Sequence, residues 1–548
     1  MNRRYEGAIL PDSITGMIFA MDGIKNAIVL LNGPMGCKFY HSTTSQYLMM
    51  RPTMKLPGDE GGQPVPVDYN YLNDWFFRQQ QVPCTYLDGY DYIYGSKEKV
   101  REGLLFFKEN IRFDFVAVIN SPGAALIGDQ LEGAVKEVLG EEVPCLLIES
   151  PGYSRSFQEG YSAASTALLS RILKGSLYEP GALSHLESEH TKSETFWINV
   201  LGMSIFDRYQ EGDREELERL LDLFHIKVNC FCCTDCSMDQ IRQIPEADLN
   251  LVLYPETGLE SAQFLEEALG MPYVLLDCPP VGYQASRQML ESICQELKVI
   301  KGGKSVDISE KKEQKFEQKL RQAAVKKGRK IGKKEGAKKV VQDKNPFTIL
   351  EAETEKSQPA DIPALREGMA VFREEEERAR ARAWSKINDI YQTTGRPKGV
   401  SFAIQGSSSA VYAYAKFFIE YLGMIPDALS LVRDDQNGRI LSQGEDLTSL
   451  TLSDQTWKSE SEKGLYQLLH EHGYEDALTQ DIYDTDAELV LADANVIAIL
   501  KTKKKVFSGI EISNPGMGYV DLVKKTHFGI QGALFLTEQV LNGLMSRI

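Results

Sequence analysis

Short apolar runs alternate with longer stretches of mixed polarity along most of the chain. Each run is six to eight residues long and is followed by a Gly or Ser turn and then by a helical pattern. Near-continuous apolar runs of this length are typical of parallel strands that helices cover on both faces. The predicted strands fall into three groups along the sequence: 27–33, 114–120 and 143–149; 196–203, 226–231, 248–254 and 272–278; 399–406, 427–434, 487–494 and 506–513.

The ends of two predicted helices support this pattern. In EALGMPYVLL and in EYLGMIPDALSLV a Gly closes the helix, a Pro follows shortly after, and a strand begins. Gly tolerates the positive φ of a helix end, and Pro does not continue a helix. The sequence therefore predicts an α/β fold made of three doubly wound, Rossmann-like parallel-sheet domains. In such sheets a ligand binds beyond the carboxyl ends of the strands.

A basic segment separates the second group of strands from the third. Residues 301–344 contain sixteen Lys or Arg and six Asp or Glu, with almost no large apolar side chains. Because this composition cannot bury a core, we expect 301–360 to be an exposed insertion, with a docking arm for an acidic partner as the alternative. The predicted domains are then 1–195, 196–300 and 361–548, and the last of them opens with a long charged helix.

Composition and charge exclude several classes of protein. The 548 residues are 43% hydrophobic and 25% charged, as in folded soluble proteins. A net charge of −17 argues against a nucleic-acid binder, which needs a basic face. Pro11 and Asp12 interrupt the N-terminal apolar stretch, and no window reaches the roughly 18 consecutive apolar residues of a membrane helix. We therefore expect a cytoplasmic protein with neither a nucleic-acid nor a membrane partner.

Four of the nine cysteines lie within seven residues, in the stretch VNCFCCTDCSM. Cys230, Cys233 and Cys236 form a C-x-x-C-x-x-C pattern, with Cys232 inside it. Three thiolates at this spacing can surround one face of an iron–sulfur cubane, as in the bacterial ferredoxin run. The loop therefore predicts a metal site with an iron–sulfur cluster of the 4Fe-4S type. The fourth ligand could be Cys232, another chain, a solvent molecule or a substrate.

Other interpretations of this loop stay open. Zinc accepts thiolates, although a structural zinc site usually takes its ligands from two separated pairs, and the sequence has no second pair. A redox dithiol is an alternative, and so are inert thiols buried at a strand end. Cys37, in LLNGPMGCKFY, follows a predicted strand and two glycines, which suits a ligand or a packed thiol.

Phosphate-binding patterns are missing from the sequence. There is no G-x-x-x-x-G-K-[ST] loop and no G-x-G-x-x-G after a first strand, so we expect the chain neither to hydrolyse ATP itself nor to bind a dinucleotide. The stretch QGSSSAVYAY is interpreted as a helix cap rather than as an anion site.

Several motifs in order along the chain resemble the catalytic-component chains of nitrogenase and its relatives. LLNGPMGCKFY is similar to the turn whose cysteine binds the family's bridging cluster, and NSPGAALIGDQLEGAVKEV and IESPGYSRSFQEGYSAA resemble two later segments. WINVLGMS, SFAIQGSSSAVYAYAKFFIEYLGMIP and FGIQGALFLTEQVL match the openings of the second and third domains and the last helix. The resemblance covers most of the chain apart from the insertion.

The resemblance implies ligand positions that this chain fills differently. Cys37 matches one bridging-cluster ligand, whereas Asp12 and Ser121 stand where the family has cysteines. An aspartate or serine oxygen can ligate iron, so a smaller cluster or a lost site are both implied. Tyr254 and Phe528 stand where the family's catalytic cofactor is held by a cysteine and a histidine, so no nitrogenase-type molybdenum cofactor is expected. The loop from Cys230 to Cys236 is expected to face the same cavity and to supply a different centre.

These observations support three hypotheses. The first is a nitrogenase-like oxidoreductase subunit that receives low-potential electrons from an ATP-dependent iron–sulfur reductase protein and passes them to a small substrate. The resemblance implies a dimer or a two-by-two tetramer with itself or a paralogous chain. The second is a non-catalytic scaffold for metal-cofactor assembly, for which an exposed thiol-rich loop would be suited. The third is a relative that binds a small organic molecule between its domains without a metal.

Overall fold

Three parallel sheets organise the protein. The computed structural model describes residues 10–34, 36, 53–54, 82–140, 143–149, 155–176, 195–302, 361–434, 440–441, 459–503, 505–513 and 521–546. Every predicted strand is found, and each belongs to one of the three sheets. The predicted fold of three doubly wound parallel sheets is therefore confirmed. The domain boundaries stay a prediction, and nearly all of the basic insertion lies outside the described residues.

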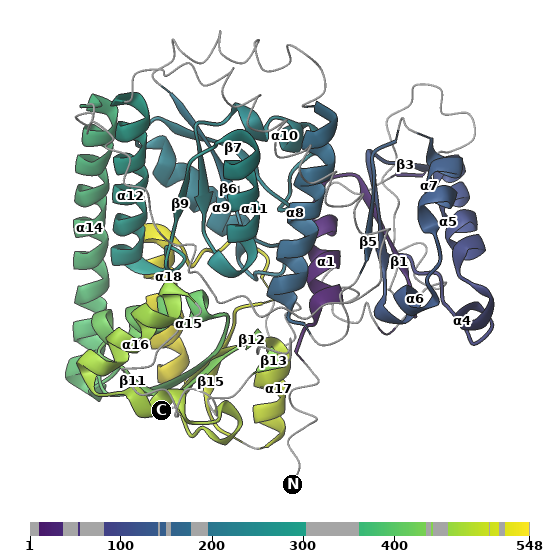
Figure 1. The fold of residues 1–548 in the computed structure, drawn as a ribbon. Coiled ribbons are helices and arrows are strands. Elements are labelled where there is room, and N and C mark those ends of the chain that lie inside the picture. Colours follow the sequence, from purple (N-terminus) through teal and green to yellow (C-terminus); the bar gives the residue numbers. More distant parts are fainter. Residues whose placement is uncertain are drawn as a thin grey trace, which may run out of the picture.

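The first sheet has the strand order β1-β4-β5, with β1 at Ala27–Asn32, β4 at Phe115–Asn120 and β5 at Cys145–Glu149. One face packs on α5 (Lys97–Asn110) and α7 (Leu131–Leu139), and the other on α1 (Ser13–Asp22) and α8 (Phe157–Ser176). In Figure 1 this sheet and its outer helices stand at one side of the molecule. The shorter elements here are α4 (Asp91–Tyr94), α6 (Pro122–Ile127) and the antiparallel pair β2 (Thr53–Met54) and β3 (Ile111–Arg112).

The second sheet has the order β7-β6-β8-β9. Its strands are β6 (Phe196–Leu201), β7 (Ile226–Phe231), β8 (Leu249–Val252) and β9 (Tyr273–Leu275). Ile198 and Val200 pack in one core with α9 (Gln210–Asp222) and α12 (Gly282–Gly302). Leu201 and Val252 belong to the core on the other face, with α10 (Met238–Arg242) and α11 (Pro255–Leu269). This two-sided burial is the reason why the strands are near-continuous apolar runs.

The third sheet has the order β11-β10-β14-β15. Its strands are β10 (Ser401–Gly406), β11 (Ile425–Leu431), β14 (Leu489–Ala492) and β15 (Ser508–Glu511). The helices α15 (Ser408–Lys416) and α16 (Glu460–His472) pack on one face and α17 (Ala494–Thr502) on the other. A π-helical turn at Phe417–Tyr421 continues α15. An antiparallel pair, β12 (Arg433–Asp434) with β13 (Ile440–Leu441), follows β11.

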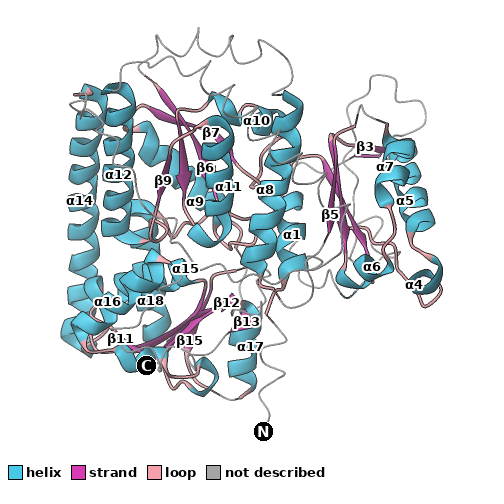
Figure 2. Ribbon diagram, in the orientation of Figure 1, coloured by secondary structure: helices cyan, strands magenta, loops and turns pink. Residues whose placement is uncertain are grey.

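Two helices join the second and third sheets. The predicted long charged helix is α14 (Pro363–Thr394), which lies beside α12, as Figure 2 shows. It buries a stripe of apolar residues at intervals of four and seven: Leu365, Phe372, Ala379, Ala383 and Ile387. The C-terminal helix α18 (Gly529–Met545) packs on α9, α12 and α14 and also contacts β14 and β15. One apolar core therefore runs through both sheets. None of the helices that the structure describes is long and apolar enough to cross a bilayer.

Helices α1 and α8 cross with their backbones in contact. A Cβ atom on Gly16 of α1 would lie 2.0 Å from the carbonyl oxygen of Phe157, and one on Gly160 of α8 would lie 2.0 Å from that of Ser13. Only hydrogen fits at these two positions. The contact places the first turn of α1 against the first turn of α8, next to the second and third sheets (Figure 1).

Gly16→Ala should lower the stability of the protein by about 3 kcal/mol, because the added methyl group overlaps a backbone atom and the helices must separate. The midpoint of thermal unfolding measures this loss. Gly133→Ala is the matched control, since Gly133 lies exposed in α7 with no atom within 4 Å of its added Cβ. The control should raise stability by about 0.5–1 kcal/mol through helix propensity. Equal midpoints for the two variants would contradict the packing described.

Candidate functional site

A cavity of about 120 Å³ lies where the second and third sheets meet. Its walls come from the carboxyl ends of β6, β8, β10, β14 and β15, which is where doubly wound sheets bind ligands. Leu10, Pro11 and Phe157, from the crossing of α1 and α8, close it on another side. Gly202 turns the chain after β6 with φ +89°, and a Cβ there would lie 2.6 Å from the carbonyl oxygen of Tyr254. Segments far apart in the sequence thus form one chamber.

Three carboxyl groups line the cavity, and each holds its protons more tightly than usual. Burial raises the pKa of Asp207 to about 7, although a hydrogen bond from the Ser204 amide acts to lower this pKa. Burial also raises the pKa of Asp493 to about 6, although this carboxylate accepts hydrogen bonds from the Asn495 amide and the Ser513 hydroxyl, both at 2.8 Å.

The third carboxyl group, Glu256, joins the two sheets. It lies in α11 and accepts hydrogen bonds from the amide and the hydroxyl of Ser409 in α15, both at 2.7 Å. Burial again raises its pKa. The helix cap predicted for QGSSS is present, since Ser407 accepts a hydrogen bond from the Ala410 amide.

Two glutamine side chains have polar atoms with no partner in the described part of the protein. Gln405, at the end of β10, is 3% exposed, and neither its amide oxygen nor its amide nitrogen makes a hydrogen bond. The amide oxygen of Gln158, in the first turn of α8, is also buried and unpaired. Both residues line the cavity. A buried amide without a hydrogen-bond partner costs free energy.

A chain of hydrogen bonds supports Tyr414, whose ring also lines the cavity. The Gln539 amide nitrogen donates to the Tyr209 hydroxyl (3.0 Å), and its oxygen accepts from His527 Nε2 (2.7 Å). His527 Nδ1 then accepts from the Tyr414 hydroxyl (2.7 Å). Burial lowers the pKa of His527 to about 4, so the imidazole is neutral and orients Tyr414.

A group of ion pairs connects the second sheet to the third. The guanidinium of Arg208 lies 2.5 Å from Glu511 Oε2 and 2.6 Å from Asp521 Oδ2. The side chains of Arg208 and Glu511 are each 1% exposed. The Arg208 amide also donates to the Ile512 carbonyl oxygen (3.2 Å), and Asp207 forms an isolated antiparallel β-bridge with Ser513. The loop after β6 is therefore attached to the end of β15.

The four clustered thiols lie away from the cavity. Cys230, Cys232, Cys233 and Cys236 are 0–3% exposed and pack in the core between α1, α8, α10 and α11. None of the described residues that line the cavity is a cysteine, so the expectation that this loop faces it is wrong. The loop points away from the cavity because Tyr161 and Thr234 donate hydrogen bonds to the Met203 carbonyl oxygen. These bonds hold the loop against α1.

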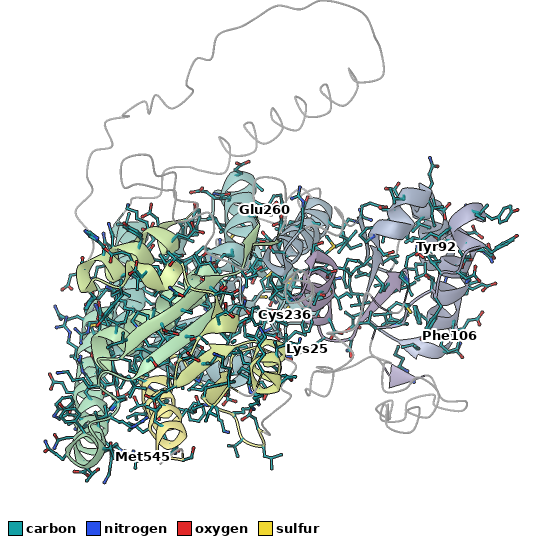
Figure 3. All side chains as sticks on the ribbon, turned by 90° about the horizontal axis from the view of Figure 1, so that it is seen from below. Lys25, Tyr92, Phe106, Cys236, Glu260 and Met545 are labelled. Carbon is teal, nitrogen blue, oxygen red and sulfur yellow. The ribbon has the colours of Figure 1, made fainter. Side chains whose placement is uncertain are left out.

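The thiol loop is attached closely to the end of α1. The Lys25 amide donates to the Cys236 carbonyl oxygen (2.8 Å), and Figure 3 labels the two residues close together. A Cβ on Gly23 would lie 1.8 Å from the Cys233 carbonyl oxygen. Cys233 and Asp235 adopt positive φ values of 60° and 52°, which a tight turn requires. Asp235 pairs with Lys25 (3.5 Å) and with Arg214 (2.8 Å).

The thiols interact with each other in two pairs. The sulfur atoms of Cys232 and Cys233 are 3.8 Å apart. A hydrogen bond from the Cys230 thiol lowers the pKa of Cys236, and the same bond raises the pKa of Cys230. Among the described residues, no group of three or more His, Cys, Asp or Glu side chains is arranged to hold a metal ion. Ligation of a cluster by the loop stays a prediction.

The predicted bridging-cluster residues lie at two helix starts. Asp12 caps α1, and its Oδ1 accepts from the amide and the hydroxyl of Thr15 (3.0 and 2.8 Å). Ser121 caps α6 through a hydrogen bond from the Ala124 amide (3.2 Å), and its amide donates to the Asn32 carbonyl oxygen. Both oxygens accept hydrogen bonds within their own helix starts, and a role as cluster ligands stays a prediction. Cys37 lies outside the described residues.

Sequence reasoning missed the cavity residues Asp207, Glu256, Gln405 and Asp493. A weak signal existed, because three of the four lie at, or within two residues of, the end of a predicted strand. Polar residues after strands are common caps, so this signal alone does not single them out.

Lowering the pH should weaken the fold through His527. Its pKa of about 4 lies below the ordinary value of 6.5, so its contribution to stability is complete above pH 6.5 and is lost as the pH falls toward 4. The loss is about 3 kcal/mol from the shift in pKa. Between pH 7.5 and 4.5 the thermal midpoint of the wild type should fall further than that of His527→Gln, which does not titrate. His472→Gln, on the surface of α16, should behave as the wild type; parallel pH profiles for wild type and His527→Gln would rule out the neutral imidazole.

Comparison with known proteins agrees with this architecture. Residues 13–341, more than half of the chain, match the family model described as nitrogenase component 1 type oxidoreductase. The chain is similar to one of the subunits of light-independent protochlorophyllide reductase from Synechococcus sp. (strain WH7803), with 29% identity over 219 residues, 39% of this chain and 40% of the relative. The corresponding subunit from Halorhodospira halophila (strain DSM 244 / SL1) is 29% identical over 198 residues, 36% of each chain. The matches thus span about two fifths of these curated relatives.

A solved structure described as "Nitrogenase Cp1 at pH 6.5" superposes with a TM-score of 0.60 at 16% identity, covering 97% of this chain and 91% of that one. At this identity the match concerns the fold, and it includes all three sheets. Together with the family match, it leads to one conclusion: the chain belongs to the nitrogenase component 1 type oxidoreductase family.

Proposed function

We propose that this chain is a nitrogenase-like oxidoreductase subunit that delivers low-potential electrons to a small substrate in the cavity between the second and third sheets. The observation that carries the proposal is the cavity itself. It lies at the carboxyl ends of the strands and holds carboxyl groups that keep protons near neutral pH. A reduction that adds hydrogen to its substrate consumes protons together with electrons, and such groups beside the substrate can supply them.

Asp207 is suited to supply these protons. With a pKa of about 7, its carboxyl group is half protonated at neutral pH and can both donate a proton and be reloaded. Asp493, with a pKa of about 6, can serve as a second proton donor and lies next to Asp207, because Ser513 pairs with Asp207 and donates a hydrogen bond to Asp493. Tyr414 is fixed by neutral His527 and presents its ring to the bound molecule. Phe157 and Phe206 contribute apolar surface that excludes water.

The electrons would enter on the α1 side. Asp12 follows Leu10 and Pro11, which line the cavity, so a centre held by Asp12, Cys37 and Ser121 would be near the substrate. A cluster there would supply single electrons at low potential. Because the chain lacks a P-loop, ATP-driven delivery would need a separate iron–sulfur reductase protein. A second copy or a paralogous chain would complete the ligand set.

The scaffold alternative loses its main support. It was based on an exposed thiol-rich loop that could pass on a labile cluster, whereas the four thiols of the loop are at most 3% exposed. Transfer of a cluster from this loop would require the core around the four thiols to open.

Iron and acid-labile sulfide per chain, measured after strictly anaerobic purification, test the proposal. We expect iron in the wild type and its loss in Cys37→Ala. ATP and an iron–sulfur reductase protein should reduce the iron centre of the wild type, as followed by absorbance. Cys294→Ala is the matched control, because this buried thiol lies in α12, outside every predicted site. The Cys230/Cys233/Cys236→Ser variant tests the prediction for the loop: loss of iron there would establish ligation by the loop.

A wild type without iron, or one whose iron the reductase with ATP does not reduce, would overturn the proposal. Iron that a chelator removes within minutes from the wild type would instead favour the scaffold function.

A further inference from the structure

Two polar atoms of the cavity lining are free to contact a bound molecule. Asp207 accepts the hydrogen bond from the Ser204 amide through Oδ2, and its Oδ1 makes no hydrogen bond with the residues that the structure describes. The hydroxyl of Tyr254, the residue before α11, also has no partner among them. Both side chains line the cavity and are half-buried, so neither atom is enclosed like the amides of Gln405 and Gln158. The cavity therefore presents one open carboxylate oxygen and one open phenol oxygen.

The open carboxylate oxygen belongs to a pair of neighbouring acids. Ser513 forms a β-bridge with Asp207 and donates a hydrogen bond to Asp493 Oδ2 (2.8 Å), so the two carboxyl groups lie next to each other. Because their pKa values are about 7 and 6, at least one of the two is ionised at neutral pH. A charge that is withdrawn from water is costly unless an opposite charge compensates it.

No cation of the described protein compensates this pair inside the cavity. None of the lining residues that the structure describes is Lys, Arg or His. The guanidinium of Arg208, in the same loop, is already paired with Glu511 and Asp521. The third lining acid, Glu256, is satisfied by Ser409, whose amide and hydroxyl donate to its two oxygens. The charge of the pair is thus left for a ligand, and an anion would be repelled.

The size and the aromatic walls define the kind of cation. Among the described residues no group of side chains is arranged to hold a metal ion. Phe157, Phe206, Tyr254 and Tyr414 instead bring aromatic rings to the walls, which bury alkyl groups and attract organic cations. A cavity of about 120 Å³ is of the same order as engineered cavities of roughly 150 Å³ that bind benzene, so it admits a compact molecule of about six non-hydrogen atoms.

We propose that this cavity binds a compact organic cation of the alkylammonium class. An N–H of the cation donates to Asp207 Oδ1, and the aromatic rings enclose its alkyl groups. One carboxyl of the pair formed by Asp207 and Asp493 then balances the cation, and the other keeps the proton that the proposed reduction uses. The role of this cation as a substrate rests on the proposed function, whereas its binding does not. Asp207 is the specificity-determining residue, because its open oxygen distinguishes an ammonium group from a carboxylate.

Three compact probes of similar shape test this assignment: tert-butylammonium, tert-butanol and pivalate. They carry a positive charge, no charge and a negative charge. Titration of the iron-depleted full chain, followed by ligand-observed NMR, should show that the wild type binds tert-butylammonium at least tenfold more tightly than tert-butanol. The reason is that a charge-assisted hydrogen bond in a buried site contributes at least about this factor. Pivalate should bind more weakly than tert-butanol, because the carboxyl pair repels it.

Asp207→Asn separates recognition of the charge from folding. The asparagine keeps an oxygen that accepts from the Ser204 amide but carries no charge. Binding of tert-butylammonium should therefore weaken at least tenfold, while binding of tert-butanol should stay unchanged. A merely structural role of Asp207 would weaken both probes alike. Glu132→Gln removes the same charge from an exposed residue of α7 and is the matched control, which should bind all three probes as the wild type does.

Four outcomes would overturn the assignment: tert-butanol bound by the wild type as tightly as tert-butylammonium, tert-butylammonium binding that is unchanged in Asp207→Asn or weakened equally in Glu132→Gln, both probes weakened alike in Asp207→Asn, or no binding of tert-butylammonium at millimolar concentration. The comparison of the three probes on the wild type needs no variant, so it decides the question even if Asp207→Asn does not fold. These outcomes are distinct from failure of the proposed function. Selective binding of tert-butylammonium by a chain that never holds iron would uphold the ligand and reject the reductase, and reducible iron without this binding would do the opposite.

Discussion

The attachment of Arg208 to Glu511 and Asp521 is the interaction on which the candidate site depends. It joins the loop after β6 to the end of β15, and all three side chains are largely withdrawn from water. Removing one partner of a buried ion pair leaves an uncompensated charge, which costs about 3–5 kcal/mol. The two sheets are therefore held at one mutual position, and the cavity between their strand ends has one shape.

The polar groups of the cavity follow from that position. Parallel strands end at the same edge, so the residues after β6, β8, β10 and β14 converge, and each brings a side chain that caps a helix or turns a loop. Burial then changes their chemistry. Asp207 and Asp493 are ordinary acids in sequence, and desolvation raises their pKa values to about 7 and 6. The amide of Gln405 has no hydrogen-bond partner among the described residues, and neither has the amide oxygen of Gln158.

The cysteine loop shows how packing can account for residues that look like ligands. Its thiols fill a core at the point where α1 ends, and the closest contact there is between Gly23 and the backbone of Cys233. The thiol of Cys230 donates a hydrogen bond to Cys236, and the sulfur atoms of Cys232 and Cys233 are 3.8 Å apart, so the four thiols interact in two pairs.

The sequence by itself determined the sheets, because two-sided burial requires near-continuous apolar runs, and even the long helix α14 was recognisable from its charged face. Motif order identified the family resemblance, and Gly at helix ends marked the boundaries between elements. Only the tertiary structure decided where the thiols point and which polar residues share a chamber. These facts depend on contacts between positions such as Arg208 and Glu511, more than three hundred residues apart. Local composition does not predict such contacts, because the free energy that stabilises them arises only when the sheets pack together.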